Sequence, residues 1–280
     1  MKLFDPYVYS PEDLESRIGA IIVKDAERMT DRVTPAEILG VMDLTTLEGT
    51  DNKERISQLC HQARFSLVHP GLPDAAAVCV YPSLVRTSKA ILSGTGIKIA
   101  SVAGAFPSGQ SSLKVKIEEI RFAIGEGADE IDTVLSRGKL LEGREEEVFD
   151  ELSAIRETCG AITLKVILET GELGSLEMVR KASELAILSG ADFIKTSTGK
   201  IPAGAEPHSF LVMLDTILEY LQKTGKSVGI KPAGGIRTGK QAGIFIALLI
   251  ETLGKQYFNK EYFRIGASSL AAEILSQTGF

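Results

Sequence analysis

The sequence predicts a single (β/α)₈ barrel of the TIM type, and two observations lead to this. Eight short apolar runs alternate with longer stretches of helical periodicity from residue 38 onward. Successive runs lie roughly 30 residues apart, which is the length of one strand–helix unit. Strands that alternate with helices form parallel sheets, and eight such units make one closed barrel. The competing architecture is a doubly wound open sheet, which usually has fewer strands per domain.

The predicted strands are residues 38–42, 76–81, 97–102, 130–135, 164–168, 193–195, 228–231 and 262–265. The predicted helices between them are residues 53–64, 113–124, 145–158, 176–188, 210–222 and 241–253. No Pro/Gly/Ser-rich linker divides the chain, so we expect one barrel domain over residues 36–280. Residues 1–35 form an expected N-terminal helical extension, because residues 11–30 have amphipathic helical periodicity. We expect this helix to cap another part of the protein or to pack on a partner.

Composition excludes several classes of function. The net charge of −6 argues against a general nucleic-acid binder, and no apolar run reaches membrane-spanning length. Three separated cysteines without a CxxC pair indicate reduced thiols, so we expect a cytoplasmic protein. His61, His69 and His208 show no metal-ligand spacing, so we predict no metal site and no cofactor.

A lysine ends the sixth predicted strand. Residues 191–200 (ADFIKTSTGK) open like a buried strand and close with the composition of a turn, with Lys195 between the two parts. The charged form of a buried lysine loses its water, which favours the neutral amine. A neutral amine can attack a carbonyl and form a Schiff base. The alternative is an edge-strand lysine whose amine reaches solvent.

Other charged residues lie on or after the predicted strands. In a barrel of this kind the active site is at the carboxyl ends of the strands, where Asp43, Asp132, Lys165 and Lys231 should converge with Lys195. Lys231, on the neighbouring strand, would favour the neutral amine of Lys195 by repulsion. Asp132 would transfer protons, directly or through a water. Lys165 either holds Asp132 ionised or makes a purely structural ion pair with it.

Small residues after the last two strands indicate a phosphate site. Backbone N–H groups, hydroxyls and a helix N-terminus bind anions well, and these loops commonly hold phosphate in such barrels. Gly199 and Lys200, in the loop after the sixth predicted strand, and Arg237 could add hydrogen bonds or charge to this site. The alternative is that the glycines only make tight turns. The predicted phosphate-binding residues are Gly199, Lys200, Gly234, Gly235, Ser268 and Ser269.

One motif resembles a nucleotide-binding loop. Residues 234–241 (GGIRTGKQ) follow a strand and nearly match the P-loop pattern, but Gln241 occupies the Ser/Thr position that would ligate Mg²⁺. No acidic strand end stands out as a second Mg²⁺ ligand. We therefore do not expect nucleotide hydrolysis.

Motifs on every predicted strand resemble the deoxyribose-phosphate aldolase family. They are MDLTTL (42–47), VCVYP (78–82), FPSG (106–109), GADEID (127–132), LKVILETG (164–171), DFIKTSTGK (192–200), GIKPAGG (229–235) and RIGASS (264–269). The resemblance runs from about residue 38 to 275 and is specific. It implies a class I, metal-free aldolase of deoxyribonucleotide catabolism. Such an enzyme reversibly cleaves 2-deoxy-D-ribose 5-phosphate to D-glyceraldehyde 3-phosphate and acetaldehyde.

The resemblance also implies roles for single residues. Lys195 matches the Schiff-base lysine, Asp132 the proton-relay acid and Lys231 the second lysine, which tunes the first. Asp43 and Lys165 match supporting residues, and the six phosphate-binding residues above match the family's cradle. Cys79 matches a cysteine that lies near the substrate pocket in some members of the family. In those members the cysteine is not required for the reaction. The implied partner is a small phosphorylated sugar, with no nucleic acid or membrane, and a homodimer is one assembly that the sequence allows.

Two departures from the family pattern stand out. Some members end in a tail whose terminal tyrosine assists proton transfer, whereas Phe280 stands last here, so we expect catalysis independent of the tail. The segment before residue 38 is also longer than in the short bacterial forms.

Two other functions compete with this one. The first is another Schiff-base aldolase, such as a transaldolase-like enzyme. The second is a sugar-phosphate binder that has lost catalysis. Lys195, Asp132 and Lys231 together argue against the binder, which would need only the phosphate cradle.

Overall fold

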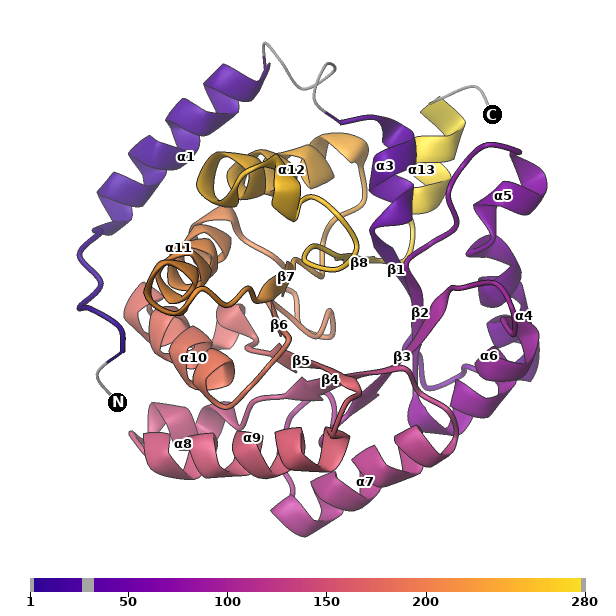
Figure 1. Ribbon diagram of the computed structural model, residues 1–280, viewed down its shortest axis with the longest axis horizontal. Coiled ribbons are helices and arrows are strands. Elements are labelled where there is room, and N and C mark those ends of the chain that lie inside the picture. Colours follow the sequence, from indigo (N-terminus) through magenta and orange to yellow (C-terminus); the bar gives the residue numbers. More distant parts are fainter. Residues whose placement is uncertain (1–2, 27–32, 278–280) are drawn as a thin grey trace.

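The strands form a closed parallel barrel. The computed structural model describes residues 3–26 and 33–277, and its eight strands are hydrogen-bonded in the order β7-β6-β5-β4-β3-β2-β1-β8. Parallel bridges from Ile230 to Phe263 and from Ala233 to Gly266 join β7 to the β8 segment and complete the ring. Figure 1 looks along the barrel from the amino ends of the strands. The predicted (β/α)₈ barrel is confirmed.

Short strands surround the barrel axis. They are β1 Met42–Thr45, β2 Ala77–Val80, β3 Lys98–Ala103, β4 Glu130–Val134, β5 Thr163–Ile167, β6 Phe193–Lys195, β7 Gly229–Lys231 and β8 Ile265–Ala267. Strands of three to six residues suffice because each is paired on both sides, which leaves no free edge.

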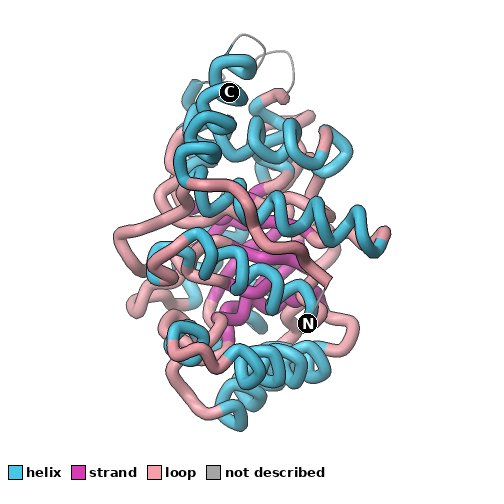
Figure 2. Tube along the Cα trace, turned by 90° about the vertical axis from the view of Figure 1, so that its left-hand side faces the viewer, coloured by secondary structure: helices cyan, strands magenta, loops and turns pink. Residues whose placement is uncertain are grey.

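Helices cover the outside of the strands, as the side view in Figure 2 shows. They are α1 Pro11–Ala26, α3 Pro35–Gly40, α4 Lys53–Gln62, α5 Phe65–Val68, α6 Val85–Ile91, α7 Leu113–Gly125, α8 Arg137–Leu141, α9 Glu145–Cys159, α10 Leu176–Leu188, α11 Pro207–Thr224, α12 Gly239–Leu253 and α13 Leu270–Gln277. Three 3₁₀ turns connect them: η1 Pro82–Leu84, η2 Thr170–Glu172 and η3 Lys255–Tyr257. None of the described helices is both long and apolar enough to cross a membrane.

The first predicted strand, residues 38–42, was misplaced, because residues 35–40 form helix α3 and the strand is Met42–Thr45. Thr34 caps this helix, since its side chain accepts a hydrogen bond from the Glu37 backbone N–H while the Glu37 side chain bonds back to Thr34. Pro35 at the first helical position fits the same start. The capping box therefore overrides the apolar run, and the strand begins at Met42.

The last predicted strand was also misplaced. Residues 262–264 precede β8, and Asn259 accepts backbone hydrogen bonds from Tyr262 and Phe263 at 3.2 and 2.8 Å. Tyr262 thus lies in the turn before the strand, whereas Phe263 makes only an isolated bridge to Ile230 of β7. Because β8 ends at Ala267, Ser268 and Ser269 follow it directly at the carboxyl end of the barrel.

The N-terminal helix packs on this chain's own barrel. Leu14 and Ile18 of α1 are buried, and α1 contacts α11 and α12 outside the helix ring (Figure 1). Arg17 donates two hydrogen bonds of 2.8 Å to Asp215 of α11. The helix was predicted to reach residue 30, but residues 27–32 lie outside the described part of the chain.

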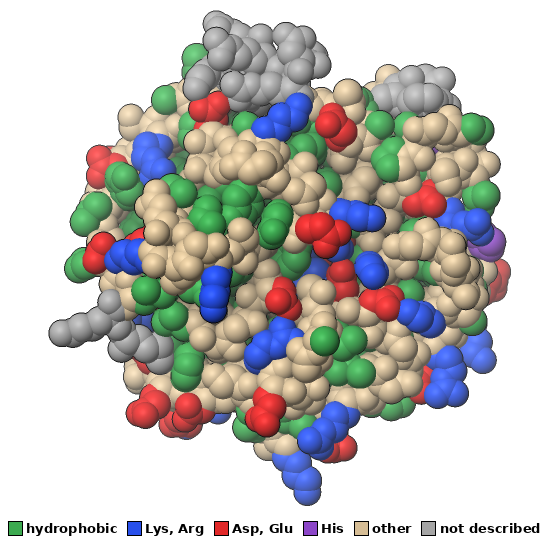
Figure 3. Space-filling view, in the orientation of Figure 1, with side chains coloured by type: hydrophobic (Ala, Val, Ile, Leu, Met, Phe, Trp, Pro, Cys, Tyr) green, Lys and Arg blue, Asp and Glu red, His purple; other side chains and the backbone are tan. Residues whose placement is uncertain are grey.

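The barrel has an apolar shell and a charged interior. The main core lies between strands and helices, whereas a separate small apolar group, centred on Cys79, Ala100 and Val102, lies inside the barrel. On the amino-end face, acidic and basic side chains gather around the centre (Figure 3). Charged side chains therefore lie on this face as well as buried inside the barrel.

Candidate active site

The strand register brings the predicted lysines together. Lys195 ends β6 and Lys231 ends β7, and the two are paired positions in the ladder between these strands. Asp132 and Lys165 are likewise paired between β4 and β5. Side chains of paired residues in parallel strands lie on the same face, here the inside of the barrel.

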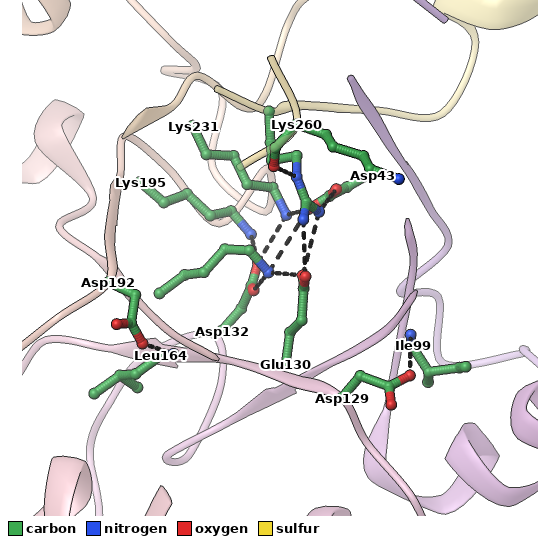
Figure 4. A network of polar contacts seen from close by, with 12 residues as sticks. Asp43, Ile99, Asp129, Glu130, Asp132, Leu164, Asp192, Lys195, Lys231 and Lys260 are labelled. Carbon is green, nitrogen blue, oxygen red and sulfur yellow. Dashed lines mark hydrogen bonds and ion pairs between the residues drawn. The ribbon is translucent and has the colours of Figure 1, made fainter. Parts of the chain in front are cut away.

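Asp132 lies at the centre of the cluster. Its Oδ2 accepts hydrogen bonds from Lys195 Nζ and Lys231 Nζ, both at 2.9 Å, and its Oδ1 accepts one from Lys165 Nζ at 2.8 Å. Figure 4 shows Lys195, Lys231 and Asp132 pointing toward one another. Burial alone would raise the pKa of Asp132, but the three lysines outweigh it and hold this pKa well below its usual value. Asp132 is therefore a carboxylate.

Asp43 and Lys231 form a second ion pair beside it. Lys231 Nζ donates to Asp43 Oδ2, and Arg264 Nη1 donates to Asp43 Oδ1 at 2.7 Å. Burial opposes the charge of Lys231, but Asp132 and Asp43 outweigh it and raise its pKa, so Lys231 is an ammonium ion. The structure thus brings together all five predicted residues of the polar cluster.

Two members of the cluster, Glu130 and Arg264, were not predicted from the sequence. Glu130 accepts a hydrogen bond from Lys165 Nζ, which also donates to Asp132. Arg264 Nη2 donates to Glu130 Oε1 at 2.8 Å. Strand alternation could have found Glu130, because it lies two residues before Asp132 and therefore on the same face. Arg264 carried no comparable signal, since its partners Glu130 and Asp43 lie 134 and 221 residues away.

Gly266 makes room for Lys231. A Cβ at position 266 would lie 3.1 Å from Lys231 Cε and 2.9 Å from Ala233 Cβ. Both contacts are closer than packed side chains tolerate. The glycine of the RIGASS motif therefore permits the lysine to cross the barrel toward Asp132.

A cavity of about 210 Å³ opens over Lys195 at the carboxyl ends. The six predicted phosphate-binding residues all line it: Gly199, Lys200, Gly234, Gly235, Ser268 and Ser269. Thr198 and Arg237 also line it, so one wall carries basic and hydroxylated side chains. The Nζ of Lys200 is 3.0 Å from Glu48 Oε1 across the entrance.

Backbone conformation shapes this wall. Gly234 has φ of 82°, and a Cβ there would lie 3.1 Å from the Gly204 Cα. The left-handed conformation and the close approach together favour glycine. Glycine at this position therefore lets the half-buried backbone line the cavity without a side chain.

Glu169 anchors the loop after β6. It is buried two residues after β5, has φ of 55°, and accepts hydrogen bonds from the backbone N–H and the hydroxyl of Thr198. Burial is the main cause that raises the pKa of Glu169. A non-glycine residue in this conformation stores strain, which fits a position that fixes a functional loop.

Cys79 lies inside the barrel near the lysines and is fully buried. Burial raises the pKa of its thiol, which therefore remains neutral and poorly nucleophilic.

Within residues 3–26 and 33–277, no group of three or more His, Cys, Asp or Glu side chains is arranged to hold a metal ion.

Comparison with known proteins assigns the chain to a family. A family model described as DeoC/LacD family aldolase matches residues 38–247. The chain belongs to this aldolase family. It is 44% identical over 247 residues to human deoxyribose-phosphate aldolase, an alignment that covers 84% of this chain and 78% of the human protein. The mouse deoxyribose-phosphate aldolase is 45% identical over the same shares of the two chains.

Solved structures agree with this family assignment. A protein from Coccidioides immitis, provisionally assigned as a deoxyribose-phosphate aldolase, superposes with a TM-score of 0.75 at 26% identity. The match covers 97% of this chain and 99% of the other. The fold and the family are therefore consistent with each other over nearly the whole chain.

Proposed function

We propose that this protein is a class I deoxyribose-phosphate aldolase, which reversibly cleaves 2-deoxy-D-ribose 5-phosphate to D-glyceraldehyde 3-phosphate and acetaldehyde. One observation carries the proposal. Lys195 borders the same cavity as the predicted phosphate-binding loops, and its Nζ lies 2.9 Å from Asp132. A nucleophile, a proton carrier and an anion site are therefore within reach of one small substrate.

The first half of the reaction makes the imine. The neutral Lys195 amine attacks the C1 carbonyl of the open-chain sugar, and loss of water gives a protonated imine. The Asp132 carboxylate and the Lys231 ammonium lie beside this nitrogen and can exchange protons with the intermediates, directly or through a water.

The second half breaks the carbon–carbon bond. Removal of the C3 hydroxyl proton lets the C2–C3 bond break, and its electron pair moves toward the iminium nitrogen to give an enamine. Glyceraldehyde 3-phosphate leaves, C2 of the enamine takes a proton, and water releases acetaldehyde from Lys195. Asp132 is suited to the proton transfers because it is a carboxylate at rest and its Oδ2 lies 2.9 Å from the Lys195 Nζ on which the imine forms.

The proposal is tested by product analysis with purified protein. Deoxyribose 5-phosphate should yield acetaldehyde and glyceraldehyde 3-phosphate in equal amounts, and chelators should not change the rate. A transaldolase-like enzyme would instead transfer a dihydroxyacetone unit between phosphorylated sugars. A protein that binds the sugar phosphate without releasing acetaldehyde would contradict the proposal.

The phosphate loops give a specific prediction. Ser268→Asp places a carboxylate on the wall where the phosphate should bind, so we expect KM for deoxyribose 5-phosphate to rise by roughly 10- to 100-fold. Unphosphorylated deoxyribose should be affected much less. Ser268→Asn is the matched control, because it has a similar size without the charge. Equal losses on both substrates would contradict the role of these loops.

Several finer features belong to the same proposal. Residues 1–35 are an extension to a catalytic domain of residues 36–280, which the position of α1 outside the helix ring supports. The three cysteines are buried free thiols, which supports the cytoplasm as the compartment. Deoxyribonucleotide catabolism is the expected pathway, and a homodimer is one assembly that the sequence allows, which sedimentation of the purified protein tests.

A further inference from the structure

Glu130 and Arg264 form an ion pair toward the amino end of the barrel interior. Arg264 Nη2 donates to Glu130 Oε1 at 2.8 Å, and its Nη1 donates to Asp43. The two side chains are only 3% and 4% exposed, and the Arg264 guanidinium lies over the Phe193 ring. Neither residue borders the substrate cavity, since Glu130 lies behind Lys165 and Arg264 behind Asp43.

The pair completes a buried network whose charges do not balance. Four cationic side chains share three carboxylates: Lys165, Lys195, Lys231 and Arg264 against Asp43, Glu130 and Asp132. With every group ionised, the network carries one excess positive charge. A net charge in a buried site is unfavourable, so loss of one proton from a cation would balance the network.

The contacts indicate which cation loses its proton. Lys165, Lys231 and Arg264 each contact two or more of the three carboxylates. Burial opposes the charge of all three, but the neighbouring carboxylates outweigh it and raise their pKa values. In ion pairs among the described residues, Lys195 contacts Asp132 alone, and it shares that carboxylate with two other lysines. Lys195 is therefore the least compensated of the four.

We infer that Glu130 and Arg264 are positioning residues that set the charge of this network so that Lys195 supplies the neutral amine. The inference rests on the proposed function, in which that amine attacks the carbonyl. The negative charge of Glu130 favours a proton on Lys195, and the positive charge of Arg264 disfavours it. The pair thereby fixes the pH above which Lys195 reacts.

Charged and titratable groups surround Lys195 from several strands. They are Asp132 and Glu130 of β4, Lys165 of β5, Lys231 of β7, Asp43 of β1, Cys79 of β2 and Arg264 before β8. Figure 4 shows the side chains of Glu130 and Asp43 inside the barrel, together with those of Lys195 and Lys231. Substituting Glu130 or Arg264 leaves the groups that contact the substrate site in place.

The test compares Glu130→Gln, Arg264→Gln and the double variant. Each is incubated with acetaldehyde and sodium cyanoborohydride from about pH 5 to about pH 9, and the rate of ethylation of Lys195 is measured by mass spectrometry. The midpoint of the profile should fall by about one pH unit in Glu130→Gln and rise by about one in Arg264→Gln. The double variant should return close to the wild-type midpoint, because both charges are removed.

Matched controls lie outside the barrel. Glu151 is 3% exposed and pairs with Lys116, and Arg180 is 4% exposed and pairs with Glu184 and Glu219. Glu151→Gln and Arg180→Gln remove the same charges from equally buried sites. They should leave the midpoint unchanged even where they reduce stability.

Opposite shifts that cancel in the double variant would support the inference, since a merely structural role would lower the rate without moving the midpoint in opposite directions. Coincident midpoints in all variants would overturn it and leave the proposed function intact. If one single variant does not fold, the other single variant decides, and a midpoint that stays within about half a unit of the wild-type value or moves in the opposite direction overturns the inference. Absence of any label on Lys195 in the wild type would overturn the proposed function itself.

Discussion

Asp132→Asn is expected to lower kcat for cleavage of deoxyribose 5-phosphate by at least about 100-fold, or about 2.7 kcal/mol of transition-state stabilisation. Asp132 accepts hydrogen bonds from three lysines and is the carboxylate that contacts Lys195. The amide has nearly the same shape but cannot take up a proton. Steady-state kinetics should show the loss mainly in kcat, because the phosphate loops that bind the substrate are unchanged.

A second measurement separates proton transfer from imine formation. Proton exchange of acetaldehyde in deuterated water should slow in Asp132→Asn, while borohydride should still trap acetaldehyde on Lys195. Asp129→Asn is the matched control, since Asp129 lies three residues earlier and pairs with Lys89 outside the barrel. Unchanged exchange in Asp132→Asn would show that another group carries the proton.

Lys231→Leu is expected to lower activity at neutral pH by at least about 100-fold and to move the remaining pH optimum upward. Lys231 is a buried ammonium ion held by Asp43 and Asp132, and its Nζ shares Asp132 Oδ2 with Lys195. Without this positive charge, Lys195 keeps its own proton to higher pH. The activity of the variant is measured against pH with saturating substrate.

Lys116→Leu is the control for loss of a buried lysine. Lys116 is fully buried between α7 and α9, and its Nζ is 2.7 Å from Glu151. Breaking such a pair costs about 3–5 kcal/mol of stability, and the same loss is expected in Lys231→Leu. Only Lys231→Leu should move the pH optimum. A raised KM with an unchanged pH profile would make Lys231 a substrate-binding residue instead.

The sequence was informative wherever local pattern decides structure. The alternation of strands and helices was enough to predict the barrel. The positions of Lys195 and Lys231 at strand ends were enough to predict that the two side chains lie close together. The errors arose where a local competitor replaced the strand signal. Thr34 and Glu37 cap helix α3, which includes most of the apolar run predicted as the first strand. The backbone carbonyl of Asn259 accepts hydrogen bonds from the apolar residues Tyr262 and Phe263 and so forms a turn before β8.

The missed residues depended on contacts far apart in the chain. Arg264 stands before β8 and becomes meaningful only when barrel closure places it against Asp43 of β1 and Glu130 of β4. Neither the residues next to Arg264 nor its position relative to the strand end predicts those partners. Glu130 was accessible in principle through strand alternation with Asp132. The charge balance of the network, in contrast, required all seven side chains in three dimensions.

The central claim is that Lys195 forms the covalent imine, and one measurement tests it most directly. The wild-type protein is incubated with acetaldehyde, reduced with sodium borohydride, digested and mapped by mass spectrometry. We predict a single ethyl group on Lys195 and a parallel loss of activity, with no label in Lys195→Met. An ethyl group on Lys165, Lys231 or Lys200 without one on Lys195, or no covalent label at all, would contradict the claim.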